Sequence, residues 1–392
     1  MADARVAGVG MVPFSKPSAG ERYEDMASGA IRAALTDAGI ELADVQQAYA
    51  SYVYGDSTAG QAALYQVGTT GIPVVNVNNN CASGSSALWL ARQAVASGAA
   101  DVVLAFGFEQ MQRGALTEHW TDRTSPLGTF ADRRDALQGT SEAPMAAQFF
   151  GGAGLAHMER FGTQASTFAH IAVKARRHAA HNPYAVFRDQ VTLEEVLGSP
   201  AVYGPLTRLQ CCPPTNGGAA VVLVSESYAR SRGLRAPVRI AGQALTSDTA
   251  SSFEGDMRQV VGYDVAVAAA EKAYAEAGIG PDDIPVVELH DCFTANELIT
   301  YEALGLTPEG TAEKFVLDGD NTYGGRIVTN PSGGLLSKGH PLGATGLAQC
   351  AELTWQLRGE AGARQVEGAR TALQHNLGLG SACVVTVYET AD

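Results

Sequence analysis

The sequence predicts an α/β protein built from two similar halves, and three observations support this prediction. Apolar runs typical of strands alternate with Ala-rich stretches typical of helices along most of the 392 residues. A chain of this length exceeds what a single hydrophobic core usually holds. Residues 33–45 and 273–284 share one pattern, an Ala-rich helix, a glycine and then an acidic turn. We therefore expect mostly parallel sheets covered by helices, in halves at residues 1–230 and 231–392.

Strands follow both copies of this pattern, at 48–53 in the first half and at 286–289 in the second. A further strand at 72–77 leads into a turn of small residues and a helix that begins near Ser83. Between residues 112 and 208 the strand pattern gives way to polar sequence that contains glycine and arginine. Because that stretch is too long for a plain loop, we predict an inserted helical subdomain that covers a site.

The composition argues against several classes of function. Hydrophobic residues make up 46% of the chain and charged residues 17%, as in ordinary globular proteins. A formal net charge of −14 argues against nucleic acid or an anionic membrane as the main partner. No apolar run reaches the length of a membrane span, and the first 20 residues lack a signal-peptide pattern. The six cysteines lack paired metal-ligand spacing, so we predict no metal site, no disulfide framework and a reducing compartment.

Cys81 is the leading candidate for a catalytic residue. It stands in the turn of small residues that joins the strand at 72–77 to the helix from Ser83. A sulfur at a helix start lies near unpaired backbone N–H groups, and the local field there favours the thiolate. Because the thiolate is the nucleophilic form, the position indicates covalent catalysis. The alternative is a buried structural cysteine, which is what most cysteines are.

Two histidine-containing turns accompany this cysteine. His290 and Cys292 follow the strand at 286–289, at the carboxyl end where α/β proteins form their sites. They can face one pocket as a polarising donor and a proton shuttle; the alternatives are a histidine paired with the neighbouring aspartate and a small core cysteine. His340 lies in a Gly-His-Pro turn, where it can donate to a developing oxyanion or hold a thiolate. Its alternative is a helix-capping imidazole.

A fourth turn, residues 375–380, follows a strand at 371–373. Its glycines, Gly378 and Gly380, expose backbone N–H groups that suit an oxyanion hole, and a plain tight turn fits the same residues. None of the Gly-rich turns of the chain matches a dinucleotide or P-loop pattern. The sequence therefore assigns no nucleotide fingerprint, and the cofactor-binding residues stay unknown.

Together these turns resemble the thiolase superfamily, and within it the thiolase domain of sterol carrier protein X. The resemblance covers essentially the whole chain and is far more specific than any single motif. It is carried by seven segments, in chain order 8–11, 54–58, 78–81, 209–213, 288–293, 319–325 and 337–346. Ordinary thiolases place a second catalytic cysteine in a C-terminal Cys-x-Gly motif, where this chain has Asn376-Leu377-Gly378. Cys383 lies beyond that motif in an apolar strand, so we regard it as structural.

The resemblance implies a thiolase fold of five αβαβα layers and at least a homodimer. It also implies acyl-CoA substrates, free coenzyme A as co-substrate and no permanently bound cofactor. Cys81 matches the acylated nucleophile, and His340 matches the residue that activates it and polarises the thioester oxygen of the substrate. Cys292 matches the acid/base, and His290 completes the first oxyanion hole with His340. The backbone N–H groups of Cys81 and Gly378 match the second oxyanion hole.

These roles imply a 3-ketoacyl-CoA thiolase, that is, an acetyl-CoA or propanoyl-CoA C-acyltransferase. Its substrates would include straight-chain, 2-methyl-branched or steroid side-chain acyl groups. Two alternatives stay open. One is a thiolase-like retro-aldolase of steroid side-chain degradation that acts with a small partner protein. Retro-aldolase relatives have lost residues of the cysteine and Gly-His-Pro set, which this chain retains. The other is a catalytically silent homologue that binds lipid or acyl-CoA. The chain shows no Ser-Lys-Leu type peroxisomal signal, so we expect a cytoplasmic location.

Overall fold

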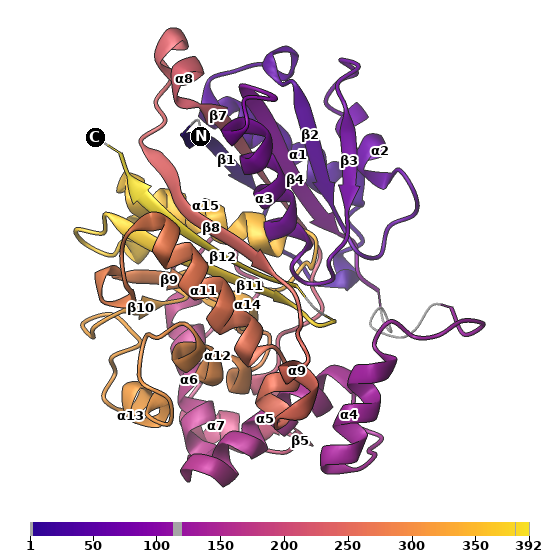
Figure 1. The fold of residues 1–392 in the computed structure, drawn as a ribbon, viewed down its shortest axis with the longest axis vertical. Coiled ribbons are helices and arrows are strands. Elements are labelled where there is room, and N and C mark those ends of the chain that lie inside the picture. The colour runs from indigo at the N-terminus through magenta and orange to yellow at the C-terminus, as the bar shows by residue number, and fades with distance from the viewer. Residues whose placement is uncertain (1–2, 113–119, 381, 392) are drawn as a thin grey trace.

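The computed structural model describes residues 3–112, 120–380 and 382–391. Its described strands form one ten-stranded sheet, in the order β10-β9-β11-β12-β8-β1-β7-β4-β2-β3, and a small sheet of β5 and β6 (Figure 1). The strands of the large sheet are β1 (Ala4–Met11), β2 (Gln47–Ser51), β3 (Val74–Val77), β4 (Val102–Glu109), β7 (Gly217–Ser225), β8 (Val238–Thr246), β9 (Val286–Glu288), β10 (Val328–Thr329), β11 (Thr371–Gly378) and β12 (Ala382–Thr390).

The large sheet consists of two halves with the same strand order. From edge to centre, the first half runs β3-β2-β4-β7-β1 and the second runs β10-β9-β11-β12-β8. The halves join where β1 pairs with β8 through Arg5–Arg239 and Val6–Val238. The same order in both halves agrees with the repeated sequence pattern. The boundary drawn at residue 230 lies within α8 (Glu226–Arg232) and stays a prediction.

Helices cover both faces of each half-sheet. Helix α1 (Tyr23–Ala38) packs on β1 and β7, and α11 (Tyr263–Ala277) packs on β8 and β12. Helices α3 (Ser83–Ala96) and α15 (Thr345–Arg358) contact each other between the two half-sheets. Alternate residues of β4 serve the two faces, since Leu104 joins the core beneath α1 and Val103 the core beneath α3. The result is the expected order of five layers, αβαβα.

The repeated helix stops were read correctly from the sequence. Helix α1 ends at Gly39, whose φ is 68°, and α11 ends at Gly278, whose φ is 73°. Both glycines adopt the left-handed conformation that L side chains rarely take, so each ends its helix and turns the chain. The turns that follow, Leu42–Asp44 and Pro281–Asp283, lead into β2 and β9.

The expectation of mostly parallel sheets is wrong. Strand β2 is parallel to β3 and β4, and β9 is parallel to β10 and β11. The remaining pairs of the large sheet, those of β7, β8 and β12 among them, are antiparallel. A parallel neighbour needs a long crossover, whereas only residues 379–381 connect β11 to β12. Strand periodicity carries no information on direction, which is why the sequence did not show this.

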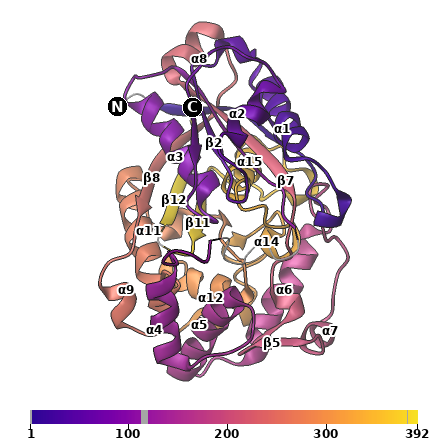
Figure 2. The ribbon, with the colours of Figure 1, turned by 90° about the vertical axis from the view of Figure 1, so that its right-hand side faces the viewer.

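The stretch between β4 and β7 contains the expected helical insertion. Its described elements lie together at one end of the molecule, below the sheet in Figures 1 and 2. They are α4 (Gly128–Gln138), α5 (Met145–Phe161), α6 (Ala165–Ala179), α7 (Leu193–Leu197), β5 (Ala201–Tyr203) and β6 (Leu206–Thr207). Residues 113–119 of the insertion expected at 112–208 lie outside the described residues.

The other helices are shorter and connect the strands of the two halves. They are α2 (Ala59–Tyr65), α9 (Ser251–Glu254), α10 (Met257–Val260), α12 (Thr294–Ala303), α13 (Ala312–Leu317) and α14 (Gly334–Ser337). In the part of the chain that the structure describes, no helix combines the length and apolar character needed to cross a bilayer.

Candidate functional site

The four turns singled out in the sequence meet at one place in the fold. Cys81 lies between β3 and α3, and Gly378 is the last residue of β11. His290 and Cys292 lie between β9 and α12, and His340 lies between α14 and α15. The turns thus gather at the carboxyl ends of β3, β9 and β11, the edge at which α/β sheets place their sites. His340 does not cap a helix directly, because α15 begins five residues later.

Three potentially reactive side chains lie close together. The Cys81 sulfur and a ring nitrogen from each of His290 and His340 all lie within 4.8 Å of one another. The two imidazole rings meet edge to face, with centroids 5.0 Å apart and an interplanar angle of 85°. Cys292 lines the same cavity, which has a volume of about 180 Å³. This arrangement places a thiol, two imidazoles and a second thiol around a single small space.

The rest of the cavity wall is mainly apolar. Part of it comes from the insertion, with Leu127 beside α4 and Met145 and Phe150 on α5. Other apolar side chains that line it are Met111, Phe293, Leu342 and Leu379. An apolar wall with a few polar groups at one place is typical of a small-molecule site. The insertion therefore covers the four turns, as expected from the sequence.

His340 presents an unprotonated nitrogen to the cavity. Its Nδ1 lies 2.7 Å from the Thr345 hydroxyl, which donates its own proton to the Pro341 carbonyl at 3.0 Å. When the hydroxyl donates to that carbonyl it accepts from His340, which puts the ring proton on Nδ1 and leaves a lone pair on Nε2. That Nε2 is buried and has no hydrogen-bond partner among the described residues. Burial lowers the pKa of His340 to about 3, which leaves the ring neutral and able to accept a proton.

His290 has the opposite arrangement. The side-chain amide of Asn376 donates to His290 Nδ1 at 3.0 Å, so the proton of the neutral ring lies on Nε2. Burial, with smaller contributions from His340 and His375, lowers the pKa of His290 well below its usual value. The neighbouring Asp291 accepts instead from the backbone N–H of Leu335, at 2.7 Å. His290 is therefore a neutral donor, and the alternative of a His290–Asp291 pair does not apply.

The resting state of Cys81 differs from the sequence-based expectation. Desolvation of the thiol, together with the nearby Glu109 carboxylate, raises the pKa of Cys81 to about 12. Desolvation and negative charge thus outweigh the field at the start of α3, and the expected resting thiolate is wrong. Cys81 is a thiol until a base removes its proton. The lone pair on His340 Nε2 belongs to the same close cluster and can act as that base.

Gly378 packs directly against the turn that carries Cys81. A Cβ atom at this position would lie 2.2 Å from the Asn79 carbonyl oxygen, so only glycine fits there. The Asn80 side chain donates to the Leu379 carbonyl at 3.0 Å and joins the two turns. This contact places the Gly378 backbone beside the nucleophile, although its role in an oxyanion hole stays a prediction.

Sequence reasoning missed Glu109, the last residue of β4. Its buried carboxylate accepts from the backbone N–H groups of Val53, Tyr54 and Gly343, at 3.1, 3.0 and 3.1 Å. It thereby links the segment after β2 to the Gly-His-Pro turn. Burial raises the pKa of Glu109 to about 7. The available signal was a charged residue at the end of an otherwise apolar strand.

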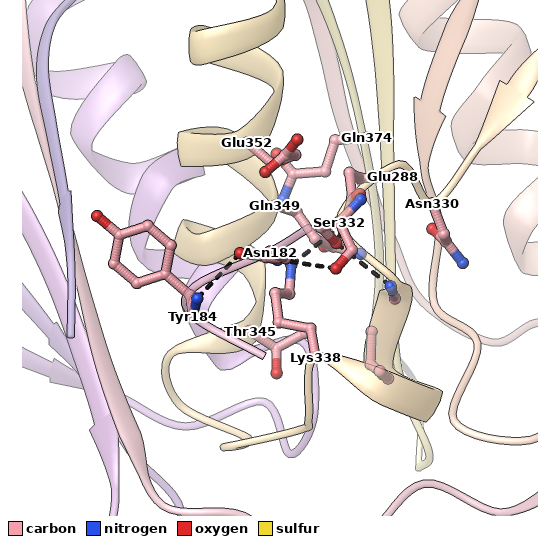
Figure 3. Close-up of polar contacts among 12 residues, drawn as sticks. Asn182, Tyr184, Glu288, Asn330, Ser332, Lys338, Thr345, Gln349, Glu352 and Gln374 are labelled. Atoms are coloured by element: carbon pink, nitrogen blue, oxygen red, sulfur yellow. Dashed lines mark hydrogen bonds and ion pairs between the residues drawn. The ribbon is translucent and has the colours of Figure 1, made fainter. Parts of the chain in front are cut away.

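Sequence reasoning also missed a buried ion pair behind the two histidine turns. Glu288, at the end of β9, accepts from Lys338 at 3.3 Å and from the Ser332 hydroxyl at 2.8 Å (Figure 3). Glu288 precedes His290 by two residues, and Lys338 precedes His340 by two. The pair therefore fixes the two turns relative to each other. The sequence signal for this ion pair was the glutamate and the lysine that stand within the two histidine-containing turns.

Two family models match the chain. One, described as the thiolase N-terminal domain, matches residues 5–227. The other, described as thiolase C-terminal domain-like, matches residues 246–390. Together they cover the two half-sheets except for most of β8.

Individual proteins match over almost the whole chain. Sterol carrier protein 2 of Homo sapiens is 53% identical over 389 residues, which cover 98% of this chain and 71% of that protein. Benzoylsuccinyl-CoA thiolase subunit BbsB of Thauera aromatica is 37% identical and covers 96% of this chain and 94% of its own length. Among solved structures, the Ltp2-ChsH2(DUF35) aldolase matches with a TM-score of 0.82 at 26% identity, over 99% of this chain and 98% of that chain.

Proposed function

Because the chain belongs to the thiolase family of acyltransferases, we propose that it cleaves 3-ketoacyl-CoA with free coenzyme A through an acyl-enzyme on Cys81. The observation that carries the proposal is the cluster of Cys81, His290 and His340, whose reactive atoms lie within 4.8 Å. Cys292 supports it from the wall of the same cavity. A thiol beside an unprotonated imidazole is an activated nucleophile.

In the first half-reaction, His340 Nε2 takes the proton of Cys81, and the sulfur attacks the 3-keto carbon. The backbone N–H groups of Cys81 and Gly378 stabilise the tetrahedral oxyanion. The bond between C2 and C3 then breaks. The acyl group stays on Cys81, and the enolate of acetyl-CoA, or of propanoyl-CoA for a 2-methyl substrate, is expelled. His290 Nε2–H and the protonated His340 donate to the enolate oxygen. Each such donor is worth roughly 3 kcal/mol in the transition state.

Cys292 handles the remaining protons. It protonates the enolate at C2 and becomes a thiolate, which then takes the proton of the incoming coenzyme A thiol. The sulfur of coenzyme A attacks the acyl-enzyme, and the departing Cys81 sulfur regains its proton from His340. All groups return to their starting states. The products are a shortened acyl-CoA and acetyl-CoA, or propanoyl-CoA when the substrate carries a 2-methyl group.

The apolar wall supports an apolar acyl group as the substrate. Leu127, Met145 and Phe150 of the insertion offer methyl, thioether and aromatic surface but no charge. We infer that straight-chain and 2-methyl-branched 3-ketoacyl groups bind there, and that steroid side-chain acyl groups are candidates. Coenzyme A would act as a co-substrate with no resident cofactor. A homodimer and a cytoplasmic location stay predictions.

The test is CoA-dependent loss of a 3-ketoacyl-CoA, with straight-chain and 2-methyl-branched substrates compared side by side. We expect cleavage that requires free coenzyme A, and the ratio of the two rates then defines the substrate class. Cys81→Ala should abolish acyl transfer while its circular dichroism and melting midpoint stay close to those of the wild type. Activity that survives in Cys81→Ala would refute the acyl-enzyme.

The structural likeness to the Ltp2-ChsH2(DUF35) aldolase favours one second candidate, a retro-aldolase that works with a partner protein. The two reactions differ in their need for coenzyme A, since a retro-aldol cleavage consumes none. Cleavage of a 3-hydroxyacyl-CoA without free coenzyme A would favour the aldolase. If neither substrate is cleaved, a silent acyl-CoA-binding homologue becomes the better description.

A further inference from the structure

We propose that Ser85 and Gln374 are positioning residues that fix the protonation pattern of His290, and so keep a hydrogen-bond donor aimed at the substrate oxygen. The inference rests on the proposed function for its catalytic meaning. Its structural basis is a buried chain of hydrogen bonds that runs from Tyr388 on β12, through Gln374, Ser85 and Asn376, to the ring of His290. We call this chain the Gln374 relay.

The direction of the relay is set at Gln374. Its side-chain amide nitrogen lies 2.7 Å from the Gly346 carbonyl and 2.8 Å from the Ser85 hydroxyl. A carbonyl can only accept, so the atom that faces Gly346 must be the nitrogen. The oxygen of the same amide faces the Tyr388 hydroxyl, which donates to it. With both ends matched, the amide of Gln374 has one orientation.

Ser85 passes this direction on to Asn376. Because the Ser85 hydroxyl accepts from Gln374, its own proton is free to be donated to the Asn376 side-chain oxygen, 2.9 Å away. The Asn376 nitrogen then faces His290 Nδ1 at 3.0 Å. In the reverse orientation of Asn376, the Ser85 oxygen would receive two donors. Its proton would then lose the Asn376 oxygen, the acceptor that the structure gives it. A buried polar proton without a partner is costly, so the first orientation prevails.

The consequence is that His290 Nδ1 must accept and Nε2 must carry the proton. Ser85, Gln374 and Asn376 are each 0% exposed, so water does not compete for these groups.

The relay also opposes metal binding. Cys81, His290 and His340 have a spacing that could hold a metal ion, but a ligand nitrogen needs a lone pair. On His290 the relay holds a proton at that nitrogen.

The test compares Ser85→Ala and Ser85→Cys with the wild type. Ser85→Ala removes the middle of the relay, so Asn376 can turn over and His290 can populate both protonation patterns. We expect kcat to fall about tenfold, the usual size of the effect when one hydrogen bond that favours a single protonation pattern is lost. KM should change less than twofold. Ser85→Cys keeps a weak donor and should lie between the two. Inhibition by Zn²⁺ should tighten in Ser85→Ala, because His290 Nε2 then offers a lone pair.

The matched control is Thr167→Val on α6, which removes another fully buried hydroxyl, one that donates to Glu313 at 2.7 Å and lies outside the relay. It should match the wild type in kcat and in Zn²⁺ inhibition.

The direct readout is the nitrogen spectrum of protein labelled with ¹⁵N-histidine, in which the His290 signals are identified by their loss in His290→Gln. We expect wild-type His290 to carry its proton on Nε2, and Ser85→Ala to show a second pattern.

Two results would overturn the inference. One is a wild-type spectrum with the His290 proton on Nδ1. The other is a Ser85→Ala protein that behaves like Thr167→Val in kcat, Zn²⁺ inhibition and spectrum. Should Ser85→Ala fail to fold, Ser85→Cys and the wild-type spectrum decide the question. The spectrum needs no substrate, so a failure of the proposed thiolase reaction would leave this test intact and recognisable as a separate outcome.

Discussion

At the scale of single residues, the cavity contains two neutral histidines that present opposite groups to the same space. His340 offers a lone pair, because Thr345 holds the proton on the other ring nitrogen. His290 offers an N–H, because Asn376 donates to its other nitrogen. Proton transfer from Cys81 converts His340 into a second donor at the moment when the substrate oxygen gains negative charge. Two donors in a buried cavity are then available without a resting positive charge.

Gly378→Ala tests the contact between the turn after β11 and the turn that carries Cys81. The added methyl group would collide with the Asn79 carbonyl, so the Cys81 turn must shift and the backbone N–H groups lose their alignment. We expect kcat to fall by roughly 10²-fold, the size of losing one oxyanion donor, with a smaller change in KM. Steady-state kinetics provide the measurement.

Gly128→Ala on α4 is the control for this substitution, since a Cβ there would meet no atom within 4 Å. It should retain wild-type kcat. Equal activity of Gly378→Ala and the wild type would show that the Gly378 backbone is not part of the reacting geometry.

At the scale of elements, buried acids hold the turns in place, and the partners of these acids could not be predicted from the sequence. Strands, helix stops and the catalytic turns have local patterns, so they were predictable. Strand direction was not, because it depends on connections rather than on periodicity. The partners of Glu109 were not predictable either, since it bonds Gly343 from a strand that lies far away in the sequence. A single charged residue at the end of a strand does not indicate which distant residues it will bond.

Glu109→Gln tests the pH dependence that this buried acid predicts. Burial raises the pKa of Glu109 from 4.5 to about 7, so the folded protein binds this proton more tightly than the unfolded chain. Its contribution to stability is therefore greatest below about pH 4.5 and is lost as the pH rises to about 7, a change of about 3 kcal/mol. Glutamine does not titrate. The stability of Glu109→Gln relative to the wild type should thus increase between pH 5 and pH 8.

Unfolding midpoints in urea at the two pH values measure this difference. The exposed Glu367→Gln serves as the control for exchanging a carboxyl for an amide. A pH-independent difference for Glu109→Gln would mean that Glu109 is already ionised in the folded protein at pH 5.

At the scale of the whole molecule, the site depends on the meeting of the two half-sheets. Cys81 comes from the first half, and His290, Cys292, His340 and Gly378 come from the second. The sequence singled out all five because each lies in a recognisable turn, and their catalytic roles stay predictions. It did not identify Ser85, Thr345 or Asn376 as the residues that set protonation. Their roles follow from hydrogen bonds that link α3, α15 and β11, and these exist only once the layers have packed.

The edge strand β3 leads to the last prediction, which concerns assembly. Among the described strands β3 pairs only with β2, and Val75 at its centre is 47% exposed. An open edge with exposed apolar residues favours pairing with another strand. A second copy of the chain, as the family resemblance implies, would satisfy it.

We therefore expect light scattering to give twice the mass of one chain, and Val75→Lys to shift the protein toward the monomer. Because β3 leads directly into the Cys81 turn, activity should fall with dissociation. Leu317→Lys on α13 changes a residue that is 57% exposed elsewhere and should leave the dimer intact. A wild-type mass of one chain, or an unchanged mass for Val75→Lys, would place the interface elsewhere or exclude it.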